Sequence, residues 1–177
     1  PEIDEKTMMT EAVKALQGVT DLPLQLDSSS TEALENALRI YNGKPLLNSV
    51  DATAEKMKKI FPLAKKYGAA VIALALDENG IPDTAEGRLS AIEKIISEAE
   101  KYGIHKKDII ADPLALTVSS EEKSAVTTLE AVRLIKDRVG VKTSLGVSNI
   151  SFGLPERDKI NSAFFAIALE NGLDCAI

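Results

Sequence analysis

The chain has 177 residues, of which 45% are hydrophobic, and a formal net charge of −6. This length and apolar content fit one globular domain with a sizeable core, which we expect to span residues 1–177. The acidic balance argues against a nucleic-acid partner, because phosphate binding needs clustered Lys and Arg. No apolar run approaches the roughly 20 residues that a membrane span needs, and the N-terminal PEIDEKTMM lacks the features of a signal peptide. The single cysteine, Cys175, excludes an internal disulfide and fits a cytoplasmic location.

Helix-like and strand-like hydrophobic periods alternate along the chain. Helical patterns occupy residues 8–18, 32–43, 52–68, 84–103, 127–140 and 157–172. Strand-like runs follow them in turn, at residues 22–27, 44–49, 69–76, 107–116, 141–148 and 173–177. We expect Gly18 to end the first helix, Ser30 to be the N-cap of the second, and Gly43 to close it.

Strict alternation of this kind predicts parallel strands joined by right-handed crossovers. The near-continuous apolar run VIALAL at 71–76 is typical of a strand covered on both faces. An open doubly wound sheet and a closed (β/α)8 TIM barrel both fit, and polar residues at several strand ends favour the barrel. A full barrel has eight strands and about 250 residues. Because the chain has six strand patterns, we expect a fragment that lacks the first two strands, the helix between them and the last helix.

Four strand-like runs end in a carboxylate or a carboxamide. These residues are Asp27 in LPLQLD, Asn48 in KPLLNS, Asp112 in KDIIAD and Asn149 in SLGVSN. Each also has a local interpretation, because Asp caps turns and Asn is common where strands end. In a barrel all four would meet at one mouth. Two carboxylates and two amides supply acceptors and donors that suit a flat heterocycle with amino and carbonyl groups better than a phosphate.

Other chemistries have weaker support in the sequence. His105 is the only histidine and lies in the turn YGIHKKD, so we expect a solvent-facing loop residue rather than a metal ligand. No GxGxxG or GxxxxGK[ST] motif is present, which argues against a phosphate-binding loop. Cys175 falls in the last strand pattern, where we expect a small buried hydrophobe. Asp27 and Asp112 could hold Mg²⁺, but the paired amides do not favour it, and we expect no metal.

Seven segments resemble, in family order, the pterin-binding (folate) domain of cobalamin-dependent methionine synthases and methyltetrahydrofolate:corrinoid methyltransferases: PEIDEKTMM, LPLQLDSSS, IYNGKPLLNSV, FPLAKKYG, ENGIPDTAEGRL, IIADPL and LGVSNISFGLPERDKIN. The resemblance implies a pterin-binding (β/α)8 barrel. It also implies an enzyme that transfers the methyl group of 5-methyltetrahydrofolate to Co(I) of a cobalamin or other corrinoid on a partner domain or protein. In a methionine synthase, a homocysteine-binding domain would be a further partner.

The resemblance implies roles for five residues. Asp27, Asn48 and Asp112 match the family residues that hydrogen-bond the pterin ring. Asn149 matches the catalytic asparagine beside N5, the nitrogen that bears the methyl group. A carboxamide does not ionise at neutral pH, so Asn149 would donate a hydrogen bond while water supplies the proton. Arg157 matches a family arginine that follows the same loop, and we count it with the substrate-binding set.

Part of the family pattern lies outside this sequence, namely the first strand with its Glu-Arg motif and the second strand. We therefore expect the fragment alone to be inactive, and its open strand edges to pair with a second copy, recruit further polypeptide or aggregate. A dihydropteroate synthase-like enzyme is the enzymatic alternative, although its Lys-x-Arg pair has no counterpart in TSLGVSNIS. A non-catalytic folate-binding module, or a truncated piece with no function of its own, is also open.

Overall fold

The computed structural model describes residues 4–121 and 123–177. Its centre is one parallel sheet in the order β1-β2-β3-β4-β5-β6, which confirms the predicted alternation. The strands are β1 (Gln25–Asp27), β2 (Leu46–Val50), β3 (Ala70–Leu74), β4 (Ile109–Asp112), β5 (Lys142–Leu145) and β6 (Cys175–Ala176). The α-helices are α1 (Glu5–Gln17), α2 (Thr31–Ile40), α3 (Ala54–Tyr67), α4 (Ala85–Lys101), α5 (Ser124–Leu134) and α6 (Arg157–Glu170). The described residues also form three short helical segments: η1 (Lys106–Asp108), η2 (Ile135–Val139) and η3 (Val147–Ser151).

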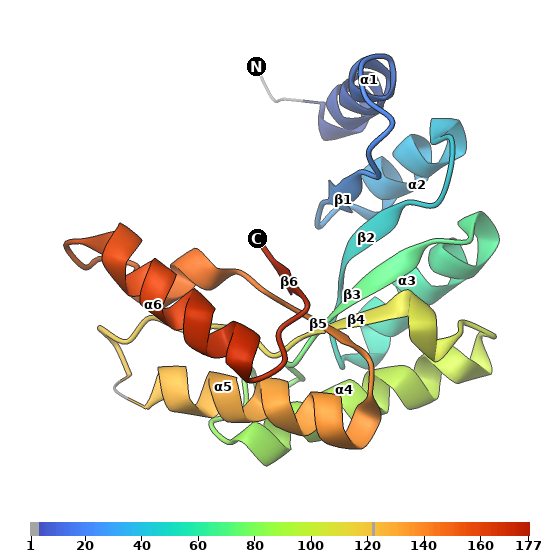
Figure 1. Cartoon of the computed structure of the whole chain (residues 1–177). Coiled ribbons are helices and arrows are strands. Elements are labelled where there is room, and N and C mark those ends of the chain that lie inside the picture. The colour runs from blue at the N-terminus through green and yellow to red at the C-terminus, as the bar shows by residue number, and fades with distance from the viewer. Residues whose placement is uncertain (1–3, 122) are drawn as a thin grey trace.

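The sheet is curved and open. Figure 1 shows β1 and β6 at its two ends, with helices α2 to α5 along its outer side. Within the described residues β1 pairs only with β2, and β6 pairs only with β5. Six parallel strands in barrel order therefore form a half-barrel, as the strand count predicted. The carboxyl ends of all six strands lie along the same edge, because every pairing is parallel.

Local sequence signals account for most helix ends. The Ser30 hydroxyl accepts a hydrogen bond from the Ala33 amide at 3.2 Å and caps α2 as predicted. Gly68 closes α3 with φ of 65°, a left-handed conformation that favours glycine. The prediction that Gly43 closes α2 is wrong, because the helix ends at Ile40 and Tyr41 is extended. The Tyr41 hydroxyl accepts a hydrogen bond from the Leu24 amide at 2.8 Å, and this contact holds the chain outside the helix.

The strands are shorter than the apolar runs that predicted them. The run at 22–27 pairs only from Gln25 to Asp27, and the run at 107–116 pairs only up to Asp112, before Pro113. Proline has no amide hydrogen for the ladder, so Pro23 and Pro113 limit these two strands. The prediction that Cys175 is buried is wrong, because its side chain is exposed. Its strand β6 has a neighbour on one side only among the described residues, so no further strand covers it.

The main core lies between the sheet and helices α2, α3 and α4. It includes Leu34, Leu47, Phe61, Val71 and Ile92, all fully buried. A smaller cluster joins β5, α5 and α6. None of the helices in the described part of the chain is long and apolar enough to cross a membrane.

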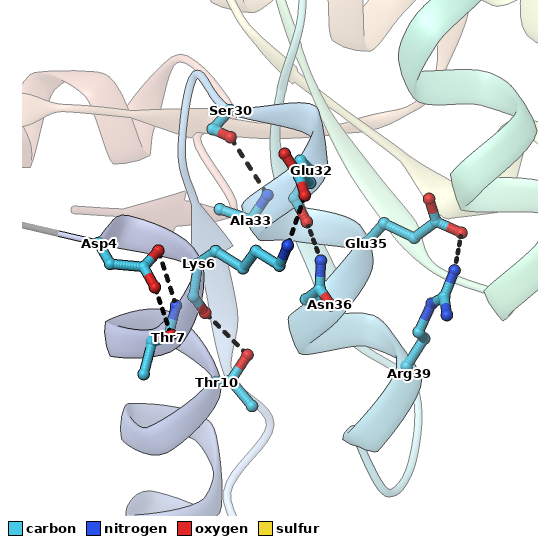
Figure 2. A network of polar contacts seen from close by, with 10 residues as sticks. All are labelled: Asp4, Lys6, Thr7, Thr10, Ser30, Glu32, Ala33, Glu35, Asn36 and Arg39. Carbon is cyan, nitrogen blue, oxygen red and sulfur yellow. Dashed lines mark hydrogen bonds and ion pairs between the residues drawn. The ribbon is translucent and has the colours of Figure 1, made fainter.

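Helix α1 is tied to α2 near the start of the chain, as Figure 2 shows. The Asp4 carboxylate accepts a hydrogen bond from the Thr7 amide at 3.4 Å and caps α1. The Lys6 ammonium lies 2.5 Å from a carboxylate oxygen of Glu32 on α2. Solvent-exposed ion pairs of this kind contribute little stability. The packing of buried Val13 is therefore the stronger anchor of α1.

Candidate functional site

The first two site residues lie side by side on neighbouring strands. Asp27 is the last residue of β1 and is in register with Asn48 of β2. The Asn48 side-chain amide donates a hydrogen bond to Asp27 Oδ2 at 3.2 Å. The prediction that β2 ends at Asn48 is wrong, because the strand runs on to Val50. Its register against β3 shifts between Asn48 and Val50, so the regular ladder is interrupted close to the predicted end.

Asp112 is the last residue of β4 and faces Leu74 of β3 in register. Its relative exposure is 7%, which is low for a carboxylate. Oδ1 accepts a hydrogen bond from the Leu114 amide at 2.8 Å. Burial raises the pKa of the Asp112 carboxyl to about 6, against an opposing effect of that hydrogen bond. Asp112 therefore titrates close to neutral pH.

Asn149 lies beyond the strand that was predicted to end on it. Strand β5 stops at Leu145, and Asn149 is part of the 3-10 helix η3. Gly146 leaves the extended conformation with φ of −72° and ψ of 80°, and its carbonyl accepts a hydrogen bond from the Asn149 amide at 3.2 Å. A Cβ at position 146 would lie 2.8 Å from Asn149 Nδ2, so the glycine makes room for the exposed carboxamide.

Arg157 is the first residue of α6 and holds the turn that carries Asn149. Its Nε donates to the Ser151 hydroxyl at 3.0 Å, and its Nη2 donates to the Ser148 carbonyl at 2.8 Å. The guanidinium carbon lies 6.0 Å from the centre of the Phe152 ring. These contacts within the chain order the Asn149 turn, and a substrate contact of Arg157 stays a prediction.

All four predicted polar residues lie toward one edge of the sheet: Asp27 and Asp112 end their strands, Asn48 lies two residues before the end of β2, and Asn149 follows β5. The structure brings Asp27 and Asn48 into direct contact, while Asp112 lies two strands away from β2. A cavity of about 440 Å³ borders this edge beside β1. It is lined by Asp27 and mainly apolar side chains of α1 and β1, and the other three residues are not in that lining. One cavity shared by all four residues stays a prediction.

Sequence reasoning missed two charged residues that support this edge. The Glu5 carboxylate of α1 accepts a hydrogen bond from the Ser28 hydroxyl, directly after Asp27. Arg88 of α4 is buried beneath the loop that follows Asp112. The signal for Arg88 was its spacing, because it lies three residues after Ala85 and four before Ile92 on the apolar face of the helix.

The described residues contain no group of three His, Cys, Asp or Glu side chains that could hold a metal ion. His105 is exposed and precedes η1, as predicted.

Residues 2–177 match the profile of a family described as "Pterin binding enzyme". The chain is 36% identical over 182 residues to the methionine synthase of Mycobacterium leprae, covering 93% of this chain and 15% of that protein. It is 36% identical over 169 residues to the methionine synthase of Mycobacterium tuberculosis, covering 88% of this chain and 14% of that protein. It is 29% identical over 182 residues to the methylcorrinoid:tetrahydrofolate methyltransferase of Eubacterium limosum, covering 100% and 66%. The chain thus spans only a part of each of these relatives.

Solved structures of similar fold include two dihydropteroate synthases. The enzyme of Clostridium difficile, determined in the presence of pteroic acid, has a TM-score of 0.79 at 20% identity and covers 99% of this chain and 70% of that one. The enzyme of Yersinia pestis has a TM-score of 0.71 at 16% identity and covers 94% and 70%. At these identities the likeness establishes the fold alone.

Proposed function

The chain belongs to the pterin binding enzyme family, and from this premise we propose that it is the folate-binding part of a methyltransferase. The reaction we propose is transfer of the methyl group of 5-methyltetrahydrofolate to the Co(I) of a corrinoid that a partner domain or protein holds. Relatives named methionine synthase and methylcorrinoid:tetrahydrofolate methyltransferase support this choice. The dihydropteroate synthases support only the shared barrel fold, at 16–20% identity.

The observation that carries the proposal is the state of Asp112. One of its oxygens, Oδ1, is held by the Leu114 amide. The other oxygen, Oδ2, makes no hydrogen bond within the described residues. Every fully buried side-chain oxygen or nitrogen in those residues does have a hydrogen-bond partner, so Oδ2 is not fully buried. Oδ2 therefore keeps some access to solvent although the residue is nearly buried. The carboxylate is held in place through Oδ1, while Oδ2 has no partner within the described residues. Such an oxygen is suited to accept a hydrogen bond from an N–H of a pterin ring.

Binding would use the edge of the sheet as a planar set of acceptors and donors. Asp112 and Asp27 accept hydrogen bonds from the amino and ring N–H groups of the pterin, and Asn48 keeps Asp27 in place through the contact between them. Positioning of this kind lowers the entropic part of the reaction barrier. Hydrogen bonds to charged groups contribute roughly 1.5–3 kcal/mol each.

Asn149 would act at the reacting nitrogen. A tertiary amine is a poor leaving group, so N5 must receive a proton or a strong hydrogen bond as the bond to the methyl carbon breaks. The nitrogen keeps the electron pair of that bond and takes its proton from water, while the Asn149 carboxamide donates a hydrogen bond. The corrinoid would supply the Co(I) nucleophile that accepts the methyl group. The exposure of Asn149 and its support by Gly146 and Arg157 favour this role.

The open strands β1 and β6 support a further part of the proposal. Two additional strands, from polypeptide outside these 177 residues or from a second copy, would complete the barrel and its pocket. The chain alone would then lack part of the site, and the intact protein is the correct object for functional tests.

Calorimetric titration of the intact protein with 5-methyltetrahydrofolate tests the proposal. Asp112→Ala should weaken binding about 10- to 150-fold, because a hydrogen bond to a charged group is lost. Asp108→Ala is the matched control, since Asp108 lies just before the opposite end of β4 and pairs with Lys44 at 2.7 Å. Equal affinities of Asp112→Ala and the unmodified protein for 5-methyltetrahydrofolate would show that Asp112 does not bind the folate and would refute the proposed pocket.

A further inference from the structure

Arg88 is a buried charge in the middle of the protein. It lies on the apolar face of α4 with a relative exposure of 1%. Burial lowers the pKa of its guanidinium, and the carboxylates of Glu121 and Asp83 act in the opposite direction. A buried charge is costly unless hydrogen bonds satisfy it. Arg88 must therefore make hydrogen bonds that an apolar residue at this position could not make.

Its hydrogen bonds converge on the loop after Asp112. Nη1 donates to the carbonyl of Pro113 at 3.1 Å and to the carbonyl of Leu114 at 2.8 Å. The same nitrogen lies 2.9 Å from the hydroxyl of Thr128 on α5, which in turn donates to the Leu114 carbonyl at 3.0 Å. Nε donates to the Pro82 carbonyl at 3.0 Å. Arg88 and Thr128 thus hold the Leu114 carbonyl from two helices.

Leu114 is in a conformation that needs such support. Its φ is 67°, in the left-handed region, where a side chain costs about 1–2 kcal/mol. Such conformations persist only where surrounding contacts enforce them, and they cluster at functional sites. In this conformation the Leu114 amide donates to Asp112 Oδ1. Arg88 and Thr128 hold the Leu114 carbonyl, and the Leu114 amide in turn orients the Asp112 carboxylate.

We infer that Arg88, together with Thr128, is a positioning residue that fixes the Asp112 carboxylate for its ligand. Arg88 holds the carbonyls of Pro113 and Leu114, one on each side of the Leu114 Cα, and thereby fixes the Leu114 amide that donates to Asp112 Oδ1. Oδ2 makes no hydrogen bond within the described residues and is available to a ligand. The ligand part of this inference rests on the proposed function, while the orientation of Asp112 can be tested without any ligand.

The ligand-free test is hydrogen–deuterium exchange of the intact protein, followed in the peptide that contains Leu114. Thr128→Val removes the hydroxyl and keeps the shape, Thr128→Ser keeps the hydroxyl, and Arg88→Lys keeps the charge but loses the planar guanidinium. We expect exchange at the Leu114 amide to rise at least about fivefold in Thr128→Val and Arg88→Lys, as loss of a hydrogen bond implies. Thr128→Ser should restore slow exchange.

Ile92→Val on the same helix face is the control for general loosening of the core, because Ile92 is fully buried in the main core. Ile92→Val should not raise the exchange rate of the Leu114 amide more than it raises the exchange rates of the β3 amides. If Arg88→Lys does not fold, the Thr128 pair alone decides the test. Unchanged exchange at Leu114 in folded Thr128→Val would overturn the inference.

The ligand test compares affinities for 5-methyltetrahydrofolate. Thr128→Val should weaken binding about fivefold, and Thr128→Ser should bind as the unmodified protein does. If Asp112→Ala weakens binding but Thr128→Val does not, Arg88 and Thr128 are structural only and the positioning role is refuted. If Asp112→Ala has no effect on binding, the proposed function fails, and the exchange result alone decides whether Arg88 orients Asp112.

Discussion

Replacing Asp112 with Asn should stabilise the protein above pH 7, although it removes a charged residue from the candidate site. The substitution keeps the size of the side chain and an oxygen that can accept the Leu114 amide. It removes the ionisable group whose pKa burial raises from 3.8 to about 6. A raised carboxyl pKa means that the folded protein disfavours the ionised form.

The sign and size of the effect follow from proton linkage. Between pH 3.8 and about 6 the folded state binds more protons than the unfolded state, so stability falls as the pH rises through this window. A shift of about two pKa units corresponds to about 3 kcal/mol, and this cost is fully present above pH 7. The shift to about 6 already includes the opposing effect of the Leu114 hydrogen bond, so that bond is not subtracted again. An asparagine does not titrate, so Asp112→Asn should be about equal to the unmodified protein in stability at pH 3.5 and about 3 kcal/mol more stable at pH 8.

Urea unfolding at pH 8, 6.5 and 5, with the midpoint and slope fitted at each pH, measures the effect. Asp112→Ala is the matched control, because it also removes the charge but leaves the Leu114 amide without its acceptor, and should be less stable than Asp112→Asn. An Asp112→Asn protein that equals the unmodified protein in stability at every pH would refute the raised pKa and the burial argument behind it.

The sequence predicted those features that depend on neighbours along the chain. Alternating periods gave parallel strands in sequential order, and Ser30 was identified as a helix cap from its residue type and place. Asp27 and Asp112 do end their strands. The helix cap is set by residues a few positions apart, and strict alternation limits how successive strands can pair, so the sequence alone carries both signals.

The features that the sequence missed depend on contacts between distant segments. Asn149 was assigned to a strand end because the apolar run continues through Val147, while Gly146 and the contacts of Arg157 form a helical turn there. Arg88 was overlooked although its apolar helical spacing marks it as buried, since its partners come from 25 to 40 residues further along the chain. Cys175 is exposed because burial of an edge strand requires a neighbour that these described residues do not provide.

Three further predictions address the chemistry, the stability and the proton linkage of the protein. Asn149→Ala should lower the methyl-transfer rate constant by about tenfold or more with a smaller loss of folate affinity; stopped-flow traces with only a binding defect would contradict its role at N5. Burial opposes the shift, but hydrogen bonds from Lys136 and Lys142 hold the pKa of Asp174 well below its ordinary value. The stability that this contributes is present above the unfolded pKa of about 3.9 and is lost as the pH falls further. The melting temperature of the unmodified protein should therefore exceed that of Asp174→Asn by less below pH 4 than at neutral pH. Finally, a pterin N–H needs the ionised form of Asp112, whose pKa is about 6 in the free protein. Folate affinity should therefore fall by up to about tenfold for each pH unit below 6, and Asp112→Asn should bind more weakly at pH 7.5 with a flat profile. Calorimetry at pH 5, 6 and 7.5 decides this, because equal affinities of the unmodified protein at all three values would show that binding does not require the Asp112 carboxylate.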